Sequence, residues 1–411
     1  MLTRHILILV ENLSVPFDRR VWQEAQALTA AGFRVTVICP VGAGLDTERE
    51  IEIDGVRILR YPLRPATGGP KGYLREYTLA LWHTVRLALH VRREGRIDVV
   101  QACNPPDLLF LVALLLRPGG TRFVFDHHDL VPELFLSRFA SGGGLLHRLT
   151  RWVERATFAC ADAVISTNES YRRVAVDRGG MSPDRVTVVR SAPDLDRFVR
   201  QQADPELLRG KKHLLAYLGV MGPQDGIDYA LRAVRSLRTD LHRNDVHCIF
   251  MGSGDVLPEM VSLSEELGIS DIVEFPGRVP DEFVQRCLST ADVCLSPDPV
   301  NPLNDVSTMN KVVEYMAMGR PIVSFELAEA RVSAGAAAMY VPGNNTAAFA
   351  RGIDTLLRDP GLRDRMGEFG RRRVEEDLSW AVSSRNLVRF YQELLEDSPP
   401  SKVHVHGGEV A

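Results

Sequence analysis

The stretch DVSTMNKVVEYMAMGRPIV, residues 305–323, carries a helix signal followed by a strand signal. Its mostly apolar run, Met309–Met318, ends at Gly319, and glycine directly after the last apolar residue is a common helix stop. Ser and Thr stand before the run, where N-cap residues are expected. The sequence therefore predicts a helix that packs on a sheet, and then the strand Ile322–Phe325.

A polar stripe is expected near the start of this helix. Ser307, Lys311 and Glu314 are four and three residues apart, which places them on one helical face. A hydroxyl, a cation and a carboxylate beside free backbone N–H groups suit a phosphorylated, hydroxyl-rich ligand. A surface Lys–Glu pair worth roughly a few tenths of a kcal/mol explains the same residues, and the stretch by itself leaves both interpretations open.

Length and composition indicate a globular protein of two domains. The chain has 411 residues, of which 45% are hydrophobic and 25% are charged, as in ordinary folded proteins. Its six cysteines are scattered without a close pair suited to metal binding, so we expect reduced core thiols, no metal and a cytoplasmic location. The apolar start MLTRHILILVEN lacks a small-residue cleavage site and predicts a strand. The apolar run Leu108–Leu116 is too short to span a bilayer.

Charge is distributed unevenly along the chain. Residues 1–198 hold 26 Lys and Arg against 22 Asp and Glu, whereas residues 199–411 hold 23 against 31. The balances of +4 and −8 sum to the formal net charge of −4. A basic first half suggests an anionic partner for that half. Nucleic acid is a poor candidate, because the sequence has no motif of the common nucleic-acid-binding folds.

The first half alternates strands with helices. The strand Ile6–Val10, the helix Asp18–Ala31 and the strand Arg34–Cys39 form a βαβ unit. The loop ENLSVPFD inside this unit lacks G-x-G-x-x-G, which argues against a dinucleotide site. Further strands are predicted over residues 98–102, 122–126, 163–167 and 186–189. This alternation predicts a doubly wound, mostly parallel sheet.

The alternation restarts in the second half, after the polar and proline-broken stretch Pro193–Gly210. Strands are predicted over residues 214–218, 246–251, 272–275, 293–296 and 322–325. A final helix, Ala381–Leu395, precedes a polar tail. The predicted segments are an N-terminal Rossmann-like domain (1–198), a linker (199–212), a second Rossmann-like domain (213–379), a C-terminal helix (380–396) and a disordered tail (397–411).

Nine segments spread over most of the chain resemble, in order, retaining glycosyltransferases of family four, the group 1 glycosyl transferases, of the bacterial polysaccharide type. Besides the helix quoted first, they are VPFDRRVWQEAQALTAAGFRVTVICP, DVVQACNPPDLLFL, FDHHDLVPELF, ISTNESYRRV, YLGVMGPQDGIDYAL, FMGSGD, VEFPGRVPDEF and ADVCLSPD. The resemblance implies the GT-B fold, in which an acceptor-side domain and a nucleotide-sugar-binding domain face each other across a cleft. It also implies that the final helix crosses back to the first domain.

The Glu-x7-Glu pair of that family is incomplete in this sequence. Glu314 matches the second member and would hold the ribose hydroxyls of the donor. The first position is Val306, and Asp305 beside it is the nearest carboxylate that could substitute. Lys311 and the helix N-terminus would stabilise the departing diphosphate. Further donor-binding candidates by resemblance are Ser307, Thr308 and Met309.

Two glycine-containing loops follow strands of the second half, and glycine lets backbone amides approach a diphosphate closely. Their donor-binding candidates are Gly222, Gln224, Gly252, Ser253 and Gly254. Family members place an Arg and a Lys in the first loop, and this sequence has neither. Lys311 or an arginine from elsewhere would then have to balance the diphosphate. By the same resemblance, Arg278 and Val279 border the base.

A His-His-Asp run follows the strand that ends at Asp126, and open parallel sheets place ligands at the carboxyl ends of their strands. His128 and Asp129 match a His-Asp pair of the family, which makes His128 a catalytic candidate beside the donor sugar. A helix-capping turn explains the same residues without a ligand. The acceptor-side candidates are His127, Asp18 and Arg19, although helix-start electrostatics also accounts for Asp18.

Two helices predicted in the basic half, Tyr73–Arg93 and Leu145–Phe158, place arginines beside an apolar face. Helices of this kind can lie on anionic membranes, and they can equally be ordinary sheet-covering helices. Together with the resemblance, they suggest a lipid-linked saccharide acceptor and peripheral docking at the inner face of a membrane.

The resemblance implies transfer of a sugar from a nucleotide diphosphate sugar to an acceptor hydroxyl, with retention of anomeric configuration and without a cofactor. A UDP-sugar is favoured over a GDP-sugar as the donor, and cell-surface polysaccharide or glycolipid assembly is the expected context. Two alternatives stay open. One is a nucleotide-sugar epimerase of the same fold, and the other is an inactive nucleotide-sugar-binding protein.

Overall fold

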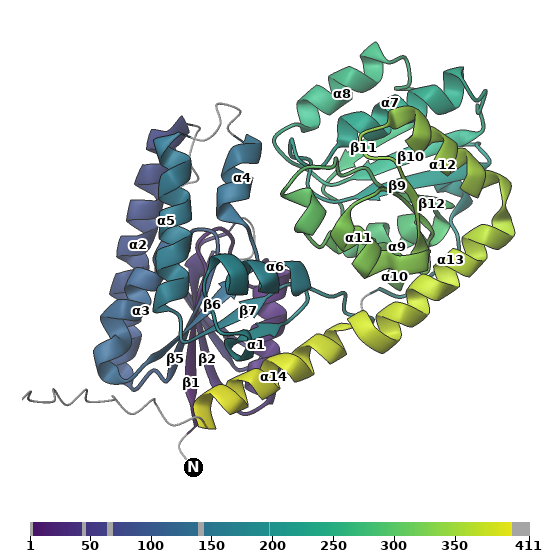
Figure 1. Ribbon diagram of the computed structural model, residues 1–411. Coiled ribbons are helices and arrows are strands. Elements are labelled where there is room, and N and C mark those ends of the chain that lie inside the picture. The colour runs from purple at the N-terminus through teal and green to yellow at the C-terminus, as the bar shows by residue number, and fades with distance from the viewer. Residues whose placement is uncertain (1–2, 43–46, 64–68, 139–143, 197, 397–411) are drawn as a thin grey trace, which may run out of the picture.

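The computed structural model describes residues 3–42, 47–63, 69–138, 144–196 and 198–396, and the predicted tail 397–411 lies outside them. Two α/β domains lie side by side, and the last helix runs from the second domain back along the first (Figure 1). The predicted fold class, two Rossmann-like domains with mostly parallel sheets, is confirmed.

The first domain is built on an eight-stranded sheet with the order β3-β4-β2-β1-β5-β6-β7-β8. Its strands are β1 (His5–Leu9), β2 (Arg34–Pro40), β3 (Glu50–Ile53), β4 (Val56–Tyr61), β5 (Val99–Cys103), β6 (Arg122–His127), β7 (Ala163–Ser166) and β8 (Val186–Val188). All neighbours are parallel except β3 and β4, which pair antiparallel. The sequence analysis missed this hairpin, because β3 is a short edge strand that buries none of its residues fully.

Helices cover the first sheet. They are α1 (Arg19–Ala30), α2 (Gly69–Glu94), α3 (Phe110–Leu116), α4 (Val131–Arg138), α5 (Leu145–Cys160) and α6 (Glu169–Arg173). The side chain of Asp18 accepts a hydrogen bond of 3.1 Å from the backbone N–H of Val21. Asp18 therefore caps α1, as the helix-start interpretation predicted.

The second domain is built on a six-stranded sheet with the order β11-β10-β9-β12-β13-β14, and every pair is parallel. Its strands are β9 (His213–Leu218), β10 (Val246–Met251), β11 (Val273–Gly277), β12 (Val293–Ser296), β13 (Ile322–Phe325) and β14 (Ala338–Val341). Strand β14 was not predicted. The quoted stretch forms α10 and β13 at the centre of this domain, as predicted to within one residue at each helix end.

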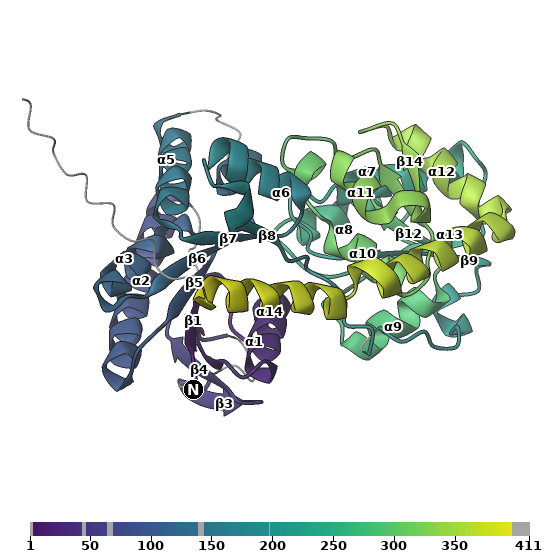
Figure 2. The same ribbon diagram turned by 60° about the horizontal axis from the view of Figure 1, so that its bottom comes forward.

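The helices of the second domain lie on both faces of its sheet (Figure 2). They are α7 (Ile227–Thr239), α8 (Leu257–Glu266), α9 (Asp281–Thr290), α10 (Asn310–Ala317), α11 (Ala328–Ala334), α12 (Thr346–Arg358) and α13 (Pro360–Arg373). The segment predicted as a linker, 199–212, packs on this domain, because Leu207 is buried in its core and the backbone of Gln201 donates to Ser289. That segment therefore belongs structurally to the second domain.

One nearly continuous helical segment joins the two domains. Helix α13 lies on the second domain, a π-helical turn (Val374–Leu378) follows, and α14 (Trp380–Glu396) crosses to the first domain, where it lies beside α1 (Figure 2). The buried anchors of α14 in the first-domain core are Leu387, Phe390, Tyr391 and Leu394.

In the part of the chain that the structure describes, no helix is long and apolar enough to cross a membrane. The described residues also contain no group of three or more His, Cys, Asp or Glu arranged to hold a metal ion.

Candidate active site between the domains

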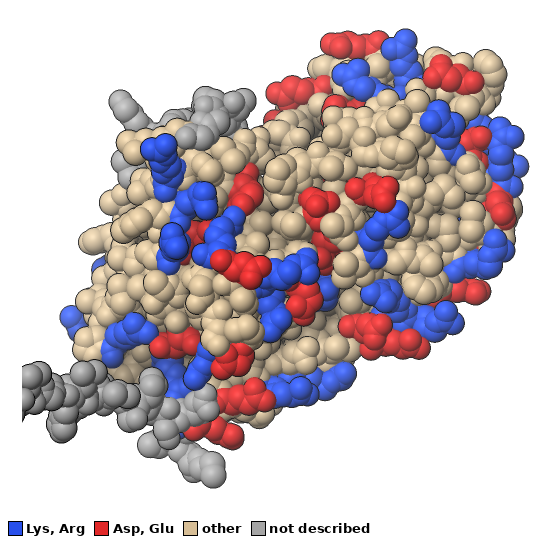
Figure 3. Space-filling model, in the orientation of Figure 1, with Lys and Arg blue, Asp and Glu red and all other residues tan. Residues whose placement is uncertain are grey.

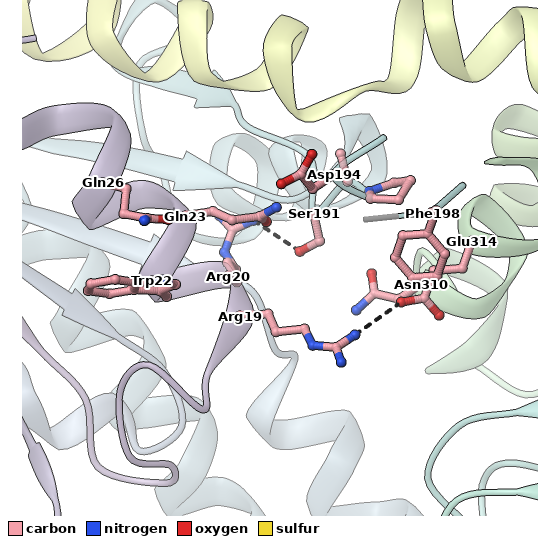
Figure 4. Close-up of a pocket in the computed structure, with 12 residues that line it drawn as sticks. Arg19, Arg20, Trp22, Gln23, Gln26, Ser191, Asp194, Phe198, Asn310 and Glu314 are labelled. Carbon is pink, nitrogen blue, oxygen red and sulfur yellow. Dashed lines mark hydrogen bonds and ion pairs between the residues drawn. The ribbon is translucent and has the colours of Figure 1, made fainter. Parts of the chain in front are cut away.

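A pocket of about 310 Å³ lies between the domains, beneath α14 (Figure 4). Helix α1 forms one wall, residues 191–194 with Phe198 form the second, and α10 forms the third. Its lining residues are Arg19, Arg20, Trp22, Gln23, Gln26, Ser191, Ala192, Pro193, Asp194, Phe198, Asn310 and Glu314. Arg19 and Glu314 are site residues predicted from the sequence, and they face each other across this pocket.

Arg19 connects the first domain to two carboxylates of the second. Its guanidinium lies 2.5 Å from Asp281 at the start of α9 and 4.0 Å from Glu314 on α10. Nearby, the guanidinium of Arg278 lies 4.0 Å from the ring centroid of Phe17, which is a cation–π contact across the cleft. We call Arg19, Asp281 and Glu314 the clasp.

Glu314 is placed by the helix that carries it. Helix α10 packs its apolar face into the second-domain core, and this leaves Glu314 at the pocket wall with 19% of its side chain exposed. A partly exposed carboxylate in an interdomain pocket can accept hydrogen bonds from ligand hydroxyl groups.

The predicted stripe of Ser307, Lys311 and Glu314 does not form. Helix α10 begins at Asn310, so Ser307 precedes it, and its hydroxyl lies 2.9 Å from the hydroxyl of Tyr171 in the first domain. Lys311 is buried in the second domain, whereas Glu314, three residues later on the same helix, lines the interdomain pocket. The predicted stripe fails at Ser307 because that residue lies outside the helix, and helical spacing alone does not determine which partners Lys311 contacts.

Lys311 belongs to a buried ion cluster. Its ammonium lies 2.6 Å from Asp298, 3.6 Å from Asp225 and 3.5 Å from the hydroxyl of Tyr217. Burial is the largest single influence and lowers the pKa of Lys311, but Asp298, Tyr217 and Asp225 together outweigh it and hold that pKa above its usual range. We call these four residues the Lys311 cluster. Two carboxylates lie within ion-pair distance of this cation, and the role of Lys311 toward a diphosphate stays a prediction.

The loop before α10 is held in place by polar contacts that were not predicted from the sequence. Asp305 accepts a 2.8 Å hydrogen bond from the first N–H of α11, so it caps that helix. Asn168 of the first domain donates to Thr308 at 2.9 Å, and Thr308 donates to Glu329 at 3.2 Å. Met309 is the N-cap residue of α10 and packs on the core. Asp305 therefore has a structural role in this arrangement.

The two glycine-containing loops pack against each other. A side chain on Gly252 would meet the carbonyl oxygen of Gly219 at 1.8 Å, and one on Gly254 would meet that of Met221 at 2.4 Å. Met221 in turn donates to the carbonyl of Ser253. These glycines are required by the close approach of two backbones, which is a reason the sequence argument did not consider.

The remaining residues of the first loop are organised around a turn. The backbone N–H of Gly222 donates to Asp225 at 2.9 Å, and Asn304 donates to the carbonyl of Gln224 at 2.9 Å. Val279 follows Arg278 after β11 and packs on the second-domain core.

At the carboxyl edge of the first sheet, four side chains surround Asp126. The guanidinium of Arg20 donates to Asp126 at 2.9 Å and lies 3.0 Å from Glu24. Gln101 donates to Glu24 at 2.7 Å and to Asp126 at 3.2 Å. Nδ1 of His128 lies 3.5 Å from Asp126. We call these five residues the Arg20 cluster.

The protonation states of this cluster follow from burial and charge. Burial alone lowers the pKa of His128, but Asp126 outweighs it and raises that pKa to about 9. Burial raises the pKa of Glu24 above its usual range, and Arg20 opposes that rise. At pH 7 His128 is an imidazolium with 12% of its side chain exposed.

His127 is not part of a site surface. It is completely buried against the aromatic rings of Phe125, Phe158 and Tyr171, and burial lowers its pKa to about 3. The prediction that His127 faces an acceptor is wrong, because its side chain points from β6 into the apolar layer beneath the sheet.

Two family models match the chain. Residues 18–192 match the glycosyl transferase 4-like domain, and residues 212–359 match the model of glycosyl transferases group 1. The chain is a group 1 glycosyltransferase with the GT-B fold. The family predicted by resemblance is therefore confirmed, and both halves of the cleft lie within matched residues.

Individual relatives agree with this assignment. The chain is 28% identical over 401 residues to D-inositol 3-phosphate glycosyltransferase of Frankia alni, a match that covers 90% of this chain and 92% of the relative. The fold is similar to sucrose-phosphate synthase of Thermosynechococcus elongatus (TM-score 0.78, 19% identity, 95% and 99% of the chains covered). It is also similar to Anabaena HepE solved with UDP-glucose (TM-score 0.69, 14% identity, 95% and 99% covered).

Sequence reasoning missed several residues of this glycosyltransferase that the structure brings together. Asp298 follows β12 at the carboxyl edge of its sheet, and the rule that led to His128 could have found it. Glu24 stands four residues after Arg20, a helical ion-pair spacing. No sequence pattern pointed to Asp281 or Asn310, because their contacts at the interdomain pocket depend on how the two domains are placed relative to each other.

Proposed function

We propose that this glycosyltransferase moves a sugar from a nucleotide diphosphate sugar, a UDP-sugar in preference to a GDP-sugar, to an acceptor hydroxyl with retention of configuration. The observation that carries the proposal is the partly exposed carboxylate of Glu314 at the wall of a polar interdomain pocket. Such a group suits the ribose hydroxyls of a nucleotide. A similar fold solved with UDP-glucose supports the choice of donor.

The charge that develops on the departing diphosphate needs cations, and Lys311 is paired with two carboxylates within its cluster. Three further cationic groups at the cleft can contribute. Arg19 is half exposed there and Arg278 is exposed, and His128 is an imidazolium at the carboxyl end of β6. Fixed cations of this kind stabilise the leaving group electrostatically without a metal ion.

The proposed reaction is a front-face displacement. The bond between the anomeric carbon and the diphosphate oxygen breaks while the acceptor oxygen attacks the same face. The acceptor's proton passes to the leaving diphosphate, so no protein base is consumed. Domain closure over the donor excludes water, which would otherwise hydrolyse it.

The test incubates the full chain with a panel of UDP- and GDP-sugars, with and without candidate acceptors, and follows nucleotide release and sugar products. Acceptor-dependent release of UDP together with a glycosylated product of unchanged anomeric configuration supports the proposal. An isomerised sugar would instead identify an epimerase. Donor binding in calorimetry without turnover on any acceptor would identify an inactive nucleotide-sugar-binding protein.

The acceptor is proposed to be a lipid-linked saccharide at the inner face of a membrane. Three neighbouring helices of the first domain, α2, α3 and α5, expose large apolar side chains. These are Leu79, Trp82, Leu111, Leu114, Leu115, Leu145, Leu146, Leu149 and Trp152. Basic side chains lie over α5 beside uncharged surface (Figure 3). Apolar groups next to arginines suit peripheral docking on an anionic bilayer.

Flotation with liposomes tests this acceptor proposal. Attraction of about 1 kcal/mol per basic residue predicts binding to anionic liposomes that high salt disrupts. Arg148/Arg151/Arg155→Ala should abolish it, whereas the exposed second-domain set Arg232/Arg235/Arg351→Ala should not. Absence of binding under every condition would point to a soluble acceptor.

A further inference from the structure

A residue of the C-terminal helix reaches into the polar interior of the first domain. Tyr391 on α14 is completely buried, and its hydroxyl donates to the side-chain carbonyl of Gln101 on β5. A buried phenol in an otherwise apolar helix face costs free energy unless its hydroxyl is used. The other buried anchors of α14 are apolar, so this hydrogen bond sets Tyr391 apart.

The hydrogen bond fixes which way the amide of Gln101 faces. With its carbonyl held by Tyr391, its NH2 group donates to Glu24 at 2.7 Å and to Asp126 at 3.2 Å. The Asp126 oxygen that accepts from Gln101 is also the oxygen that lies 3.5 Å from His128. The contacts thus run from α14 through Gln101 and Asp126 to His128.

We propose that Tyr391 is a positioning residue for His128: by fixing the Gln101 amide, it holds the Asp126 carboxylate toward the imidazole. Without the hydroxyl, the amide can turn, and Asp126 is free to rotate toward its shorter partner, Arg20, at 2.9 Å. The already long contact with His128 then lengthens. The importance of His128 for sugar transfer rests on the proposed function, but its positioning by Tyr391 does not.

The charged and titratable groups around His128 come from two elements and its own loop. Helix α1 contributes Arg20 and Glu24, strand β6 contributes Asp126 and, from its opposite side, His127, and the loop contributes Asp129. Cys103 of β5 contacts the same Asp126 oxygen. Among them Asp126 is the largest influence that favours the imidazolium, and Arg20 opposes it. Weaker contact with Asp126 therefore lowers the affinity of His128 for its proton.

The same helical segment also contacts the donor side of the cleft. Gly367 and Gly370 of α13 pack closely against Gly319 and Met316 at the end of α10, and Arg371 donates to the carbonyl of Ala317. A side chain on Gly367 would meet the Gly319 carbonyl at 2.2 Å. The segment α13–α14 therefore links the helix that carries Glu314 to the carboxylate that holds His128.

The experiment is a histidine titration of the free, full-length protein by NMR, with no sugar present. The signal of His128 is assigned by its loss in His128→Gln. In Tyr391→Phe, which keeps the ring and removes only the hydroxyl, the pKa of His128 should fall by roughly 0.5–2 units toward its ordinary value. Asp126→Asn gives the scale of a complete loss of the carboxylate.

Phe390→Leu is the matched control, because Phe390 is a buried neighbour on α14 in the same core cluster. It should leave the His128 titration unchanged. An unchanged or raised pKa in Tyr391→Phe, or an equal fall in Phe390→Leu, would overturn the proposal. Because no substrate is used, this result stands apart from whether the protein transfers a sugar.

Discussion

Each sheet carries a buried ion cluster at its carboxyl edge, and the two clusters are built differently. In the Lys311 cluster one cation is shared by two carboxylates, and Lys311 has 7% of its side chain exposed. In the Arg20 cluster two cations share Asp126, and the contacts end at His128, which is partly exposed. The first arrangement pairs its cation with two carboxylates, whereas the second leaves His128 partly exposed beside a single carboxylate that Arg20 also contacts.

The largest expected effect tests the first half of this contrast. Lys311→Met removes the cation beside Asp298, whose side chain is 1% exposed, and leaves an uncompensated buried charge. We expect the free energy of unfolding to fall by about 3–5 kcal/mol. Urea unfolding measures it, and Lys212→Met, at an exposed lysine of the same domain, is the control.

A different result would break the comparison. If Lys311→Met unfolds like the parent protein but loses affinity for nucleotide sugars, its charge is directed at the donor and not at Asp298. The Lys311 cluster would then be a binding site, and the two clusters would have the same role.

The next effect concerns a residue on the same helix as Lys311. Glu314 lies at the pocket wall, so Glu314→Ala should leave the fold intact and weaken donor binding. Loss of a charge-assisted hydrogen bond of ~1.5–3 kcal/mol lowers affinity roughly tenfold to a hundredfold. Calorimetry with UDP-sugars measures this, and Glu326→Ala, at an exposed ion pair on the second domain, serves as the control. Equal affinity of parent and Glu314→Ala would remove Glu314 from the site.

The contrast between Lys311 and Glu314 shows what the sequence could predict. The apolar period of the 305–323 stretch was enough for the helix, its stop and the strand after it, because those depend on local pattern. The partner of each polar side chain depends on tertiary packing, and Ser307, which was expected on the helix face, precedes the N-cap residue Met309. Lys311 pairs with Asp298, which lies outside the 305–323 stretch, so that stretch alone could not predict the ion pair.

Contacts between the domains could not be predicted from the sequence for a different reason. Arg19 was proposed from its place at the start of α1, but its partners Asp281 and Glu314 are more than 250 residues away along the chain. Likewise, Tyr391 was missed among the apolar anchors of the final helix, since tyrosine often serves as a core residue. The family resemblance supplied the roles that local pattern could not.

A smaller effect is expected from the pH dependence of the Arg20 cluster. The pKa of His128 is raised in the folded protein to about 9, so the ion pair stabilises the fold fully below pH 6.5 and is lost as pH rises through 9. Between pH 6 and 10 the parent protein should therefore lose more stability than His128→Gln.

Urea unfolding at a series of pH values checks this difference. His90→Gln is the control, because His90 is an exposed histidine on α2, and it should follow the parent protein. Parallel pH curves for the parent and His128→Gln would show that Asp126 does not hold a proton on His128, and the contrast with the Lys311 cluster would lose its basis.

The smallest effect is expected at the clasp, where the cation is exposed instead of buried. Arg19 and Asp281 have 51% and 44% of their side chains exposed, so solvent and salt screen their attraction. Arg19→Gln should change the free energy of unfolding by less than about 1 kcal/mol.

Because the same guanidinium faces the proposed diphosphate, donor affinity should fall several-fold at low salt, and this difference should shrink at high salt. Arg331→Gln is the matched control, since Arg331 pairs with Glu326 at 2.6 Å, both are 53% exposed, and the pair lies within one domain. If the two variants bind the donor equally well, Arg19 only links the domains. His128 and Arg278 would then be the cations that stabilise the negative charge of the leaving diphosphate.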